Sequence, residues 1–365
     1  MEIDTICMSG GGIKGISFIG ALDYLNNIKY IDITKIKNWV GTSAGSVVAL
    51  LLSCGYTTLE IGDFVVDFDF KKIELDISID NVFINYGISN GERFEFILQS
   101  FIKNKFDLDD ITFKELYEIT NNNLLIIGTN FTKCCEEVFS YKTTPDMSVL
   151  IAARISCSIP IFFTPVFYNE CYYVDGCVKN NFPINHCNSK TTLGLYIKHK
   201  DIIKEISSIV SIVTGCLGMI TDTITFKNVF LHENVIQIEN YTNEAIKFDL
   251  TIENKLKIIN LGQIYAKKFI DEIPLKIVKS ILDDIIETIS NRDQPKKYKD
   301  SQTQTDLVNL ANNQTQTDLF NLEESPIINN LQDNQTQTEL IRMDVDAEVV
   351  ADADVDVDFE YNTSP

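Results

Sequence analysis

The stretch CMSGGGIKGISFIGAL, residues 7–22, raises the question on which the fold and the chemistry of this chain depend. An apolar run is broken by Gly10, Gly11 and Gly12 and then resumes with apolar residues at helical spacing. A glycine turn between a strand and a helix presents backbone N–H groups to a negative charge. That charge is either the pyrophosphate of a dinucleotide or the oxyanion formed during ester cleavage. Other motifs in the sequence are needed to distinguish these two functions.

The dinucleotide alternative has some support in this stretch. Gly10, Gly12 and Gly15 satisfy the pattern G-x-G-x-x-G between a predicted strand and a predicted helix. The acidic residue that would bind the ribose is Asp32, which lies near the expected distance along the chain. Because no clear strand ends at Asp32, the glycine pattern alone leaves both alternatives open.

A second motif favours ester chemistry. The segment NWVGTSAGSVVALLL, residues 38–52, places Gly41, Ser43 and Gly45 in the pattern G-x-S-x-G between a short strand and an apolar helix. This is the position of a nucleophile elbow, in which a strained turn exposes the serine hydroxyl at a helix N-terminus. The segment predicts that Ser43 is a nucleophile.

A serine nucleophile needs a proton acceptor. The three histidines, His186, His199 and His232, lie in polar surroundings typical of the surface, although a triad using one of them stays open. Asp175, in YYVDGCVKNNFP, ends an apolar strand directly before Gly176. An aspartate before glycine is usually only a turn former, so the assignment of Asp175 as the base depends on the other motifs.

Taken together and in this order, the motifs resemble the patatin-like phospholipase family. They are GGGIKG at 10–15, GTSAG at 41–45, ARISCSIPIFFTP at 153–165 and DGCVKNNFP at 175–183. The similarity spans most of residues 1–200, and the joint occurrence is much more specific than any single motif.

The resemblance implies a three-layer α/β/α fold with a central, mostly parallel sheet, and a carboxylic ester hydrolase that acts on lipids without a metal or cofactor. It implies Ser43 as nucleophile and Asp175 as proton acceptor, with the backbone N–H groups of Gly10, Gly11 and Gly12 as oxyanion hole. The substrate would be a fatty-acyl ester of phospholipid or lysophospholipid type. The remaining motif glycines are Gly15, Gly41, Gly45 and Gly176. One departure is Cys177, where the family usually has Gly or Ala, and we expect this small side chain to be accommodated.

Alternating strand-like and helix-like segments independently favour an α/β fold. We expect one domain over residues 1–290, with a motif core at 5–200 and a helical continuation at 200–290. The predicted strands are 5–9, 37–41, 123–132, 138–141, 171–174 and 193–198. The predicted helices are 46–54, one capped by Thr112 and Glu115, 148–155, 254–270 and 275–289.

Residues 291–365 form a tail with a different composition. They contain few large apolar residues, and 5 Lys/Arg against 16 Asp/Glu, which predicts an acidic, disordered segment. The tail contains three similar seven-residue repeats. Each repeat contains a Thr-Gln-Thr triplet that resembles the linear motif bound by dynein light chain through strand addition. The triplets are Thr303, Gln304 and Thr305; Thr315, Gln316 and Thr317; and Thr336, Gln337 and Thr338. An alternative function is therefore a catalytically inactive scaffold that recruits dynein light chain.

The formal net charge of −21 argues against nucleic acid as a partner, since phosphate binding needs a basic surface. The nine cysteines are scattered, with one adjacent pair, Cys134 and Cys135, and no CxxC pairing, which favours reduced thiols. The N-terminal sequence is not that of a signal peptide, so we expect a cytoplasmic protein with transient contact at membrane surfaces. The uncharged segment 206–221 is too short for a membrane span and predicts a buried helix or a lid. The Phe-rich segment DFVVDFDF, residues 63–70, is expected in the core, with an acyl channel as the alternative.

Overall fold

The computed structural model describes residues 3–76, 79–199, 212, 213, 215, 216, 218, 219, 232, 234–240 and 249–292. The chain divides into two units, Met1–Lys279 and Ser280–Pro365, and the second contributes only the last residues of helix α10 to the described part. The strands are β1 (Thr5–Met8), β2 (Asn38–Thr42), β3 (Gly87–Ser89), β4 (Asn123–Asn130), β5 (Cys135–Ser140), β6 (Ile161–Phe163), β7 (Val166–Tyr168), β8 (Cys171–Asp175), β9 (Thr192–His199) and β10 (Val235–Asn240). The α-helices are α1 (Ile16–Asn27), α2 (Ala44–Ser53), α3 (Thr58–Asp67), α4 (Ile79–Asn85), α5 (Glu92–Phe106), α6 (Phe113–Thr120), α7 (Val149–Ser156), α8 (Cys177–Asn180) and α10 (Ile252–Arg292), and the 3-10 turns are η1 (Gly12–Gly15), η2 (Ile33–Lys35), η3 (Phe70–Asp76) and η4 (Pro183–His186).

The main sheet is mixed and has the order β10-β9-β1-β2-β4-β8-β7, with β5 also paired to β4. The pairings from β10 to β4 are parallel, whereas β5, β8 and β7 are joined by antiparallel pairings. Met8 pairs with Gly41, so the residues that follow β1 and β2 emerge at the same edge of the sheet. Asp175, the last residue of β8, pairs with Gly128 on β4.

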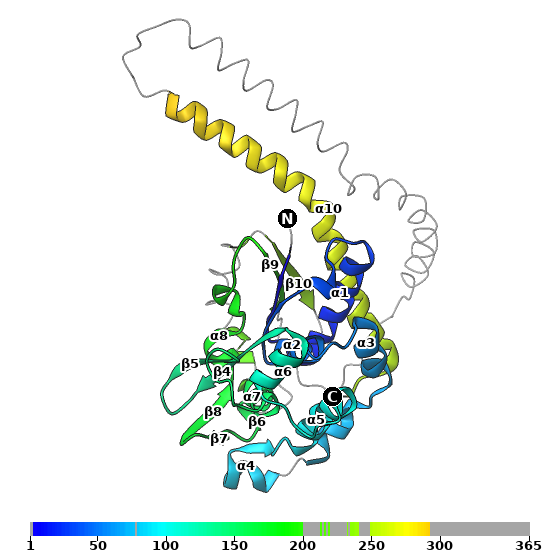
Figure 1. Cartoon of the computed structure of the whole chain (residues 1–365), viewed down its shortest axis with the longest axis vertical. Helices are drawn as coiled ribbons and strands as arrows, with labels where there is room; N and C mark the ends of the chain where they lie inside the picture. Colours follow the sequence, from blue (N-terminus) through cyan, green and yellow to red (C-terminus); the bar gives the residue numbers. More distant parts are fainter. Residues whose placement is uncertain are drawn as a thin grey trace, which may run out of the picture. The chain divides into compact units, whose positions relative to one another are not determined.

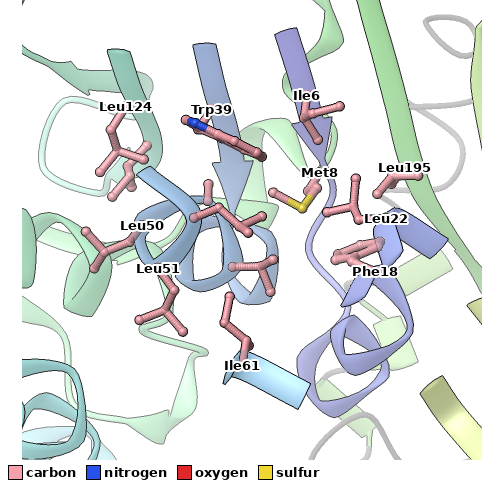
Figure 2. Close-up of a cluster of buried hydrophobic side chains, with 14 of the residues drawn as sticks. Ile6, Met8, Phe18, Leu22, Trp39, Leu50, Leu51, Ile61, Leu124 and Leu195 are labelled. Carbon is pink, nitrogen blue, oxygen red and sulfur yellow. The ribbon is translucent and has the colours of Figure 1, made fainter. Parts of the chain in front are cut away.

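The main core lies between one face of this sheet and helices α1 and α2 (Figure 2). Side chains point to this face at alternate positions of the strands, as the pleat of a sheet requires. Ile6 and Met8 on β1 and Trp39 on β2 contact the same cluster as Phe18 on α1 and Leu50 on α2. Burial of each such side chain contributes about 1.5–3 kcal/mol, so this layer fixes the positions of β1 and β2.

The opposite face of the sheet carries a smaller apolar cluster. It includes Cys7 and Val40 from the central strands, with Phe182 and Ile184 in the same cluster. Cys7 and Val40 alternate with the residues of the main core, so both faces of β1 and β2 are covered. This packing holds the segment that follows Asp175 against the sheet.

Helix α10 packs on α1 (Figure 1), where glycines permit close contact between the two backbones. A Cβ at Gly20 would overlap the carbonyl of Ile259, and one at Gly262 would overlap the carbonyl of Ser17. Lys255 is buried on α10, and its Nζ donates to the carbonyls of Val66 at 2.9 Å and Phe68 at 2.7 Å. This cation therefore ties α10 to the C-terminal end of α3.

The structure confirms the α/β class, the mostly parallel sheet and the predicted strands to within a few residues. The capping box of Thr112 and Glu115 is also present. One prediction is wrong: the helices expected at 254–270 and 275–289 are a single helix, α10, because Pro274 removes one helical hydrogen bond without ending the helix. The elements that were not predicted are helices α3, α4, α5 and α8 and strands β3, β6, β7 and β10.

Several predictions fall on residues that the structure leaves undescribed. The predicted tail begins at 291, but Asn291 and Arg292 are the last residues of α10, and residues 293–365 with their Thr-Gln-Thr triplets lie outside the described part. Most of segment 206–221 lies outside it as well. Within the described residues, the helices are all too short or too polar to cross a membrane.

Candidate active site

The glycine turn follows β1 and leads into η1. Gly10 N–H donates to the backbone carbonyl of Asn181 at 2.9 Å. Within the described chain, the N–H groups of Gly11 and Gly12 donate to no protein acceptor, and Gly12 has a φ of 56°, which favours glycine. Of the three predicted oxyanion donors, Gly10 is therefore already bonded, while Gly11 and Gly12 have their N–H groups available.

Ser43 occupies a sharp turn between β2 and α2. Its φ of 52° and ψ of −124° lie in a region that side chains other than glycine rarely adopt. Gly41 and Gly45 permit this turn, because a Cβ at Gly41 would overlap the carbonyl of Gly45 and one at Gly45 would approach the carbonyl of Met8. The turn has the geometry of a nucleophile elbow, with Ser43 at the N-terminus of α2.

Ser156, at the end of α7, supports this strained backbone. Ser43 N–H donates to Ser156 Oγ at 2.9 Å, and the Ser156 hydroxyl donates in turn to the carbonyl of Ile127 at 2.6 Å. The Ser156 carbonyl also accepts from Gly176 N–H at 3.2 Å. Ser156 thus connects the turn that holds Ser43 with the turn that follows Asp175.

The structure brings Ser43 and Asp175 together. Ser43 Oγ donates to Asp175 Oδ2 at 2.8 Å, and both side chains are buried, with 5% and 0% exposed. Asp175 Oδ1 accepts from Cys177 N–H at 2.8 Å. Burial raises the pKa of Asp175 to about 6, against the opposing effect of the hydrogen bonds from Cys177 and Ser43. A carboxylate with this pKa can accept and return a proton near neutral pH.

Two thiols flank the pair. Cys177 begins α8, and burial together with the negative charge of Asp175 raises the pKa of its thiol well above the usual value. Burial raises the pKa of the Cys157 thiol as well. Both sulfurs are therefore protonated at neutral pH, which makes them poor nucleophiles. The turn accommodates Cys177 while its backbone N–H binds the carboxylate.

The other candidate residues are not assembled with Ser43. His186 pairs with Glu136 at 2.5 Å, and within the described residues Ser43 has no hydrogen bond to a histidine. Asp32 caps η2 before the start of β2, so it lies at the sheet edge opposite the glycine turn. A ribose ligand must lie at the same edge as that turn, so the dinucleotide alternative lacks its acidic residue.

An apolar cavity of about 170 Å³ opens beside Ser43. Its wall combines Gly12 and Ser43 with side chains of α1, α2, α3, η3 and α5. The aromatic part of this wall is Phe64, Phe68, Phe70, Phe94, Phe101 and Phe163. The cavity exceeds the roughly 150 Å³ apolar void that takes up benzene. The segment 63–70, expected mainly in the core, therefore supplies Phe64, Val65, Phe68 and Phe70 to the cavity wall.

Sequence reasoning missed two parts of this site. Ser156 lies within the quoted segment 153–165, but the Ser-x-Pro pattern of that segment singles out Ser158 and not Ser156. The contribution of α5 was also missed, although Phe94, Ile97, Leu98 and Phe101 follow the i, i+3, i+4, i+7 spacing of a helical apolar face. The described residues contain no group of three or more His, Cys, Asp or Glu side chains that could hold a metal ion.

The fold and the elbow define a class of α/β protein with a serine–aspartate pair at the carboxyl edge of a mixed sheet. The sequence model of the patatin-like phospholipase family matches residues 6–187, and this part of the chain belongs to that family.

Among the relatives, probable lipid hydrolase 463L of Invertebrate iridescent virus 6 is 39% identical over 186 residues, and uncharacterized protein R571 of Acanthamoeba polyphaga mimivirus is 31% identical over 185 residues. Each alignment covers 50% of this chain, and 62% and 61% of the respective relative. The fold is also similar to that of VipD from Legionella pneumophila, with a TM-score of 0.53 and 17% identity over 74% of this chain and 67% of VipD.

Proposed function

We propose that this protein hydrolyses fatty-acyl esters of lipids, with Ser43 as nucleophile and Asp175 as proton acceptor. The observation that carries the proposal is the 2.8 Å hydrogen bond from Ser43 Oγ to the buried Asp175 carboxylate, at the wall of an apolar cavity. Membership of the patatin-like phospholipase family and the similarity to a probable lipid hydrolase support the same reaction class.

In the acylation step, Ser43 Oγ attacks the ester carbonyl carbon while its proton passes to Asp175 Oδ2. The Oγ–C bond forms, and the carbonyl π electrons move to oxygen. When the tetrahedral intermediate collapses, the bond to the alcohol breaks, and Asp175 returns the proton to the leaving oxygen. The acyl group is then attached to Ser43.

The developing oxyanion is assigned to Gly11 and Gly12. Their N–H groups are available, whereas the predicted contribution of Gly10 is replaced by its hydrogen bond to the carbonyl of Asn181. Fixed N–H donors at this position stabilise the transition state by about 3 kcal/mol each in comparable hydrolases. The N-terminus of α2 adds a favourable dipole at the same place.

Deacylation repeats these steps with water. Asp175 accepts a proton from the water that attacks the acyl carbon, and it then returns this proton to Ser43 Oγ as the fatty acid leaves. The apolar cavity beside Ser43 is assigned to the acyl chain, because its wall offers almost only apolar side chains. A phospholipid or lysophospholipid is the substrate class that we propose.

Labelling with a fluorophosphonate tests this proposal without a choice of substrate. We expect a covalent adduct on Ser43, mapped by mass spectrometry, that is absent in Ser43→Ala and strongly reduced in Asp175→Asn. Ser53→Ala removes a buried hydroxyl at the opposite end of α2 and should label normally. Wild-type protein that is folded but does not label would contradict the hydrolase proposal and favour the alternative of an inactive scaffold.

Three other predictions extend this proposal. The functional domain is residues 1–290, contact with the membrane surface is transient, and the three Thr-Gln-Thr triplets of the tail bind dynein light chain. Pull-down of dynein light chain by the full chain, lost when all three triplets are changed to alanine, tests the last of these independently of catalysis.

A further inference from the structure

Asn181 has a carboxamide whose position the hydrolase mechanism does not yet explain. Its side chain is 4% exposed, and in the described chain its Nδ2 has no hydrogen-bond partner. A buried amide donor without a partner destabilises the folded state, and such groups in native proteins call for a specific reason.

The carboxamide of Asn181 lies next to the proposed nucleophile. A Cβ placed on Gly10 would overlap Asn181 Oδ1, and the same point is 3.2 Å from Ser43 Cβ. Both side chains therefore lie close to the same point beside Gly10. The N–H of Gly10 cannot donate to the oxyanion here, because it already donates to the backbone carbonyl of Asn181.

The neighbouring asparagine provides the contrast. Asn180 Nδ2 donates to Glu136 Oε1 at 3.1 Å and to Asn185 Oδ1 at 2.9 Å, so the donor group of its carboxamide is used within the protein. Asn180 and Asn181 are adjacent and both buried, yet only the second keeps a free donor.

We propose that Asn181 is a further catalytic residue, whose Nδ2 donates to the oxyanion together with Gly11 and Gly12. This inference rests on the proposed hydrolase function. When Ser43 Oγ bonds to the acyl carbon, the π electrons move to the carbonyl oxygen. This oxyanion then accepts a hydrogen bond from Asn181 Nδ2, which has no partner before the reaction in the described chain. A side-chain amide fixed before the reaction requires no reorganisation when the charge develops.

The test compares Asn181→Leu with Asn180→Leu in the full chain, using hydrolysis of a soluble short-chain nitrophenyl ester and thermal unfolding. We expect Asn181→Leu to lower kcat about 100-fold with little change in KM, and to unfold at the same or a higher temperature because a buried unpaired donor is removed. Asn180→Leu should show the reverse, with a lower unfolding temperature and an almost unchanged kcat of the folded protein.

Asn181→Asp is the second variant, in case leucine does not fit. It keeps the shape, replaces the donor by a carboxylate oxygen and should lower kcat at least as much. A wild-type kcat in either Asn181 variant would overturn the inference. A lower kcat in Asn181→Leu that comes with a lower unfolding temperature, and that returns to the wild-type value in Asn181→Asp, would also overturn it. Fluorophosphonate labelling of Ser43 distinguishes these results from failure of the hydrolase proposal, in which the wild-type protein does not label.

Discussion

Ser156 fixes the backbone of Ser43 through a single hydrogen bond, in which Ser43 N–H donates to Ser156 Oγ at 2.9 Å. The turn that it supports has a φ of 52° at Ser43. A residue in such a conformation persists only where its surroundings hold it there. The orientation of the Ser43 hydroxyl toward Asp175 therefore depends on a residue of α7 that contributes no group to the chemistry.

We expect Ser156→Ala to lower kcat by about 10- to 100-fold, because a small displacement of the nucleophile has an effect of this size. The buried Ser43 N–H also loses its acceptor, which should lower the free energy of unfolding by about 1–3 kcal/mol. Steady-state kinetics and thermal unfolding measure the two effects. Ser53→Ala, which removes a buried hydroxyl bonded within α2, is the control and should leave kcat unchanged. A similar kcat in both variants would contradict the supporting role of Ser156.

The pH dependence of the reaction should follow Asp175. Its pKa is raised to about 6 by burial, and only the ionised carboxylate can accept the proton of Ser43. We therefore expect kcat/KM to rise with pH through an inflection near pH 6 and to be constant above it. A rate profile of the wild-type protein on a soluble ester measures this, with unfolding monitored at each pH. An inflection near the ordinary carboxyl pKa would show that the base is exposed to water.

The same raised pKa predicts how the stability of Asp175→Asn, relative to that of the wild-type protein, changes with pH. In the wild-type chain, the folded state holds a proton on Asp175 up to about pH 6, whereas the unfolded state loses it near its ordinary value. Between these two values, stability falls as pH rises, and above the higher value the loss is complete. Asparagine does not titrate, so the free energy of unfolding of the variant, relative to that of the wild-type protein, should rise across this window by about 3 kcal/mol. Denaturant unfolding of both proteins below and above the window tests this, and a constant difference would contradict it.

The cavity should determine which acyl chains react. Ile97 and Phe96 are neighbours on α5, but Ile97 lines the cavity, whereas Phe96 is 63% exposed. Ile97→Trp fills part of the cavity, so we expect it to shift the preference toward shorter esters and to lower kcat/KM for long ones about 10- to 100-fold. Phe96→Trp places the same indole ring outside the cavity and should leave the preference unchanged. A series of nitrophenyl esters from butyrate to palmitate measures both variants, and equal profiles would exclude this cavity as the acyl site.

Much of this fold could be predicted because its signals are local. The glycines at 10–12 and 41–45 mark turns that only small residues allow, and the apolar runs before them are typical of buried strands. If β1 and β2 pair in parallel, their carboxyl ends must lie at the same edge of the sheet, so the proximity of the two turns follows from the strand prediction alone. The elements that were missed, such as α3 and α5, carry charged residues among their apolar ones. The helical spacing of the apolar residues in α5 becomes informative only once the cavity that they line is known.

The hydrogen bonds that hold the turns of the site in place could not be predicted, because they join segments that are distant in the sequence. Ser156 and Ser43 are far apart in the sequence, and nothing in their neighbours indicates that one accepts a hydrogen bond from the other. The same holds for Asn181, which the sequence presents only as a polar residue in a loop. The use of Gly10 N–H by Asn181 removes one donor from the oxyanion hole that the motif alone implied.

Lys255 lies well beyond the residues that match the family, 6–187, yet it binds the carbonyls of Val66 and Phe68 at the end of α3. The side chains of this region line the cavity beside Ser43. A fragment cut where the recognisable sequence ends would keep Ser43 and Asp175 but would lose Lys255, which anchors one wall of the cavity. A shortened version of this chain must therefore retain the part of α10 that carries Lys255, and chimeras with its relatives should exchange this part of α10 together with α3.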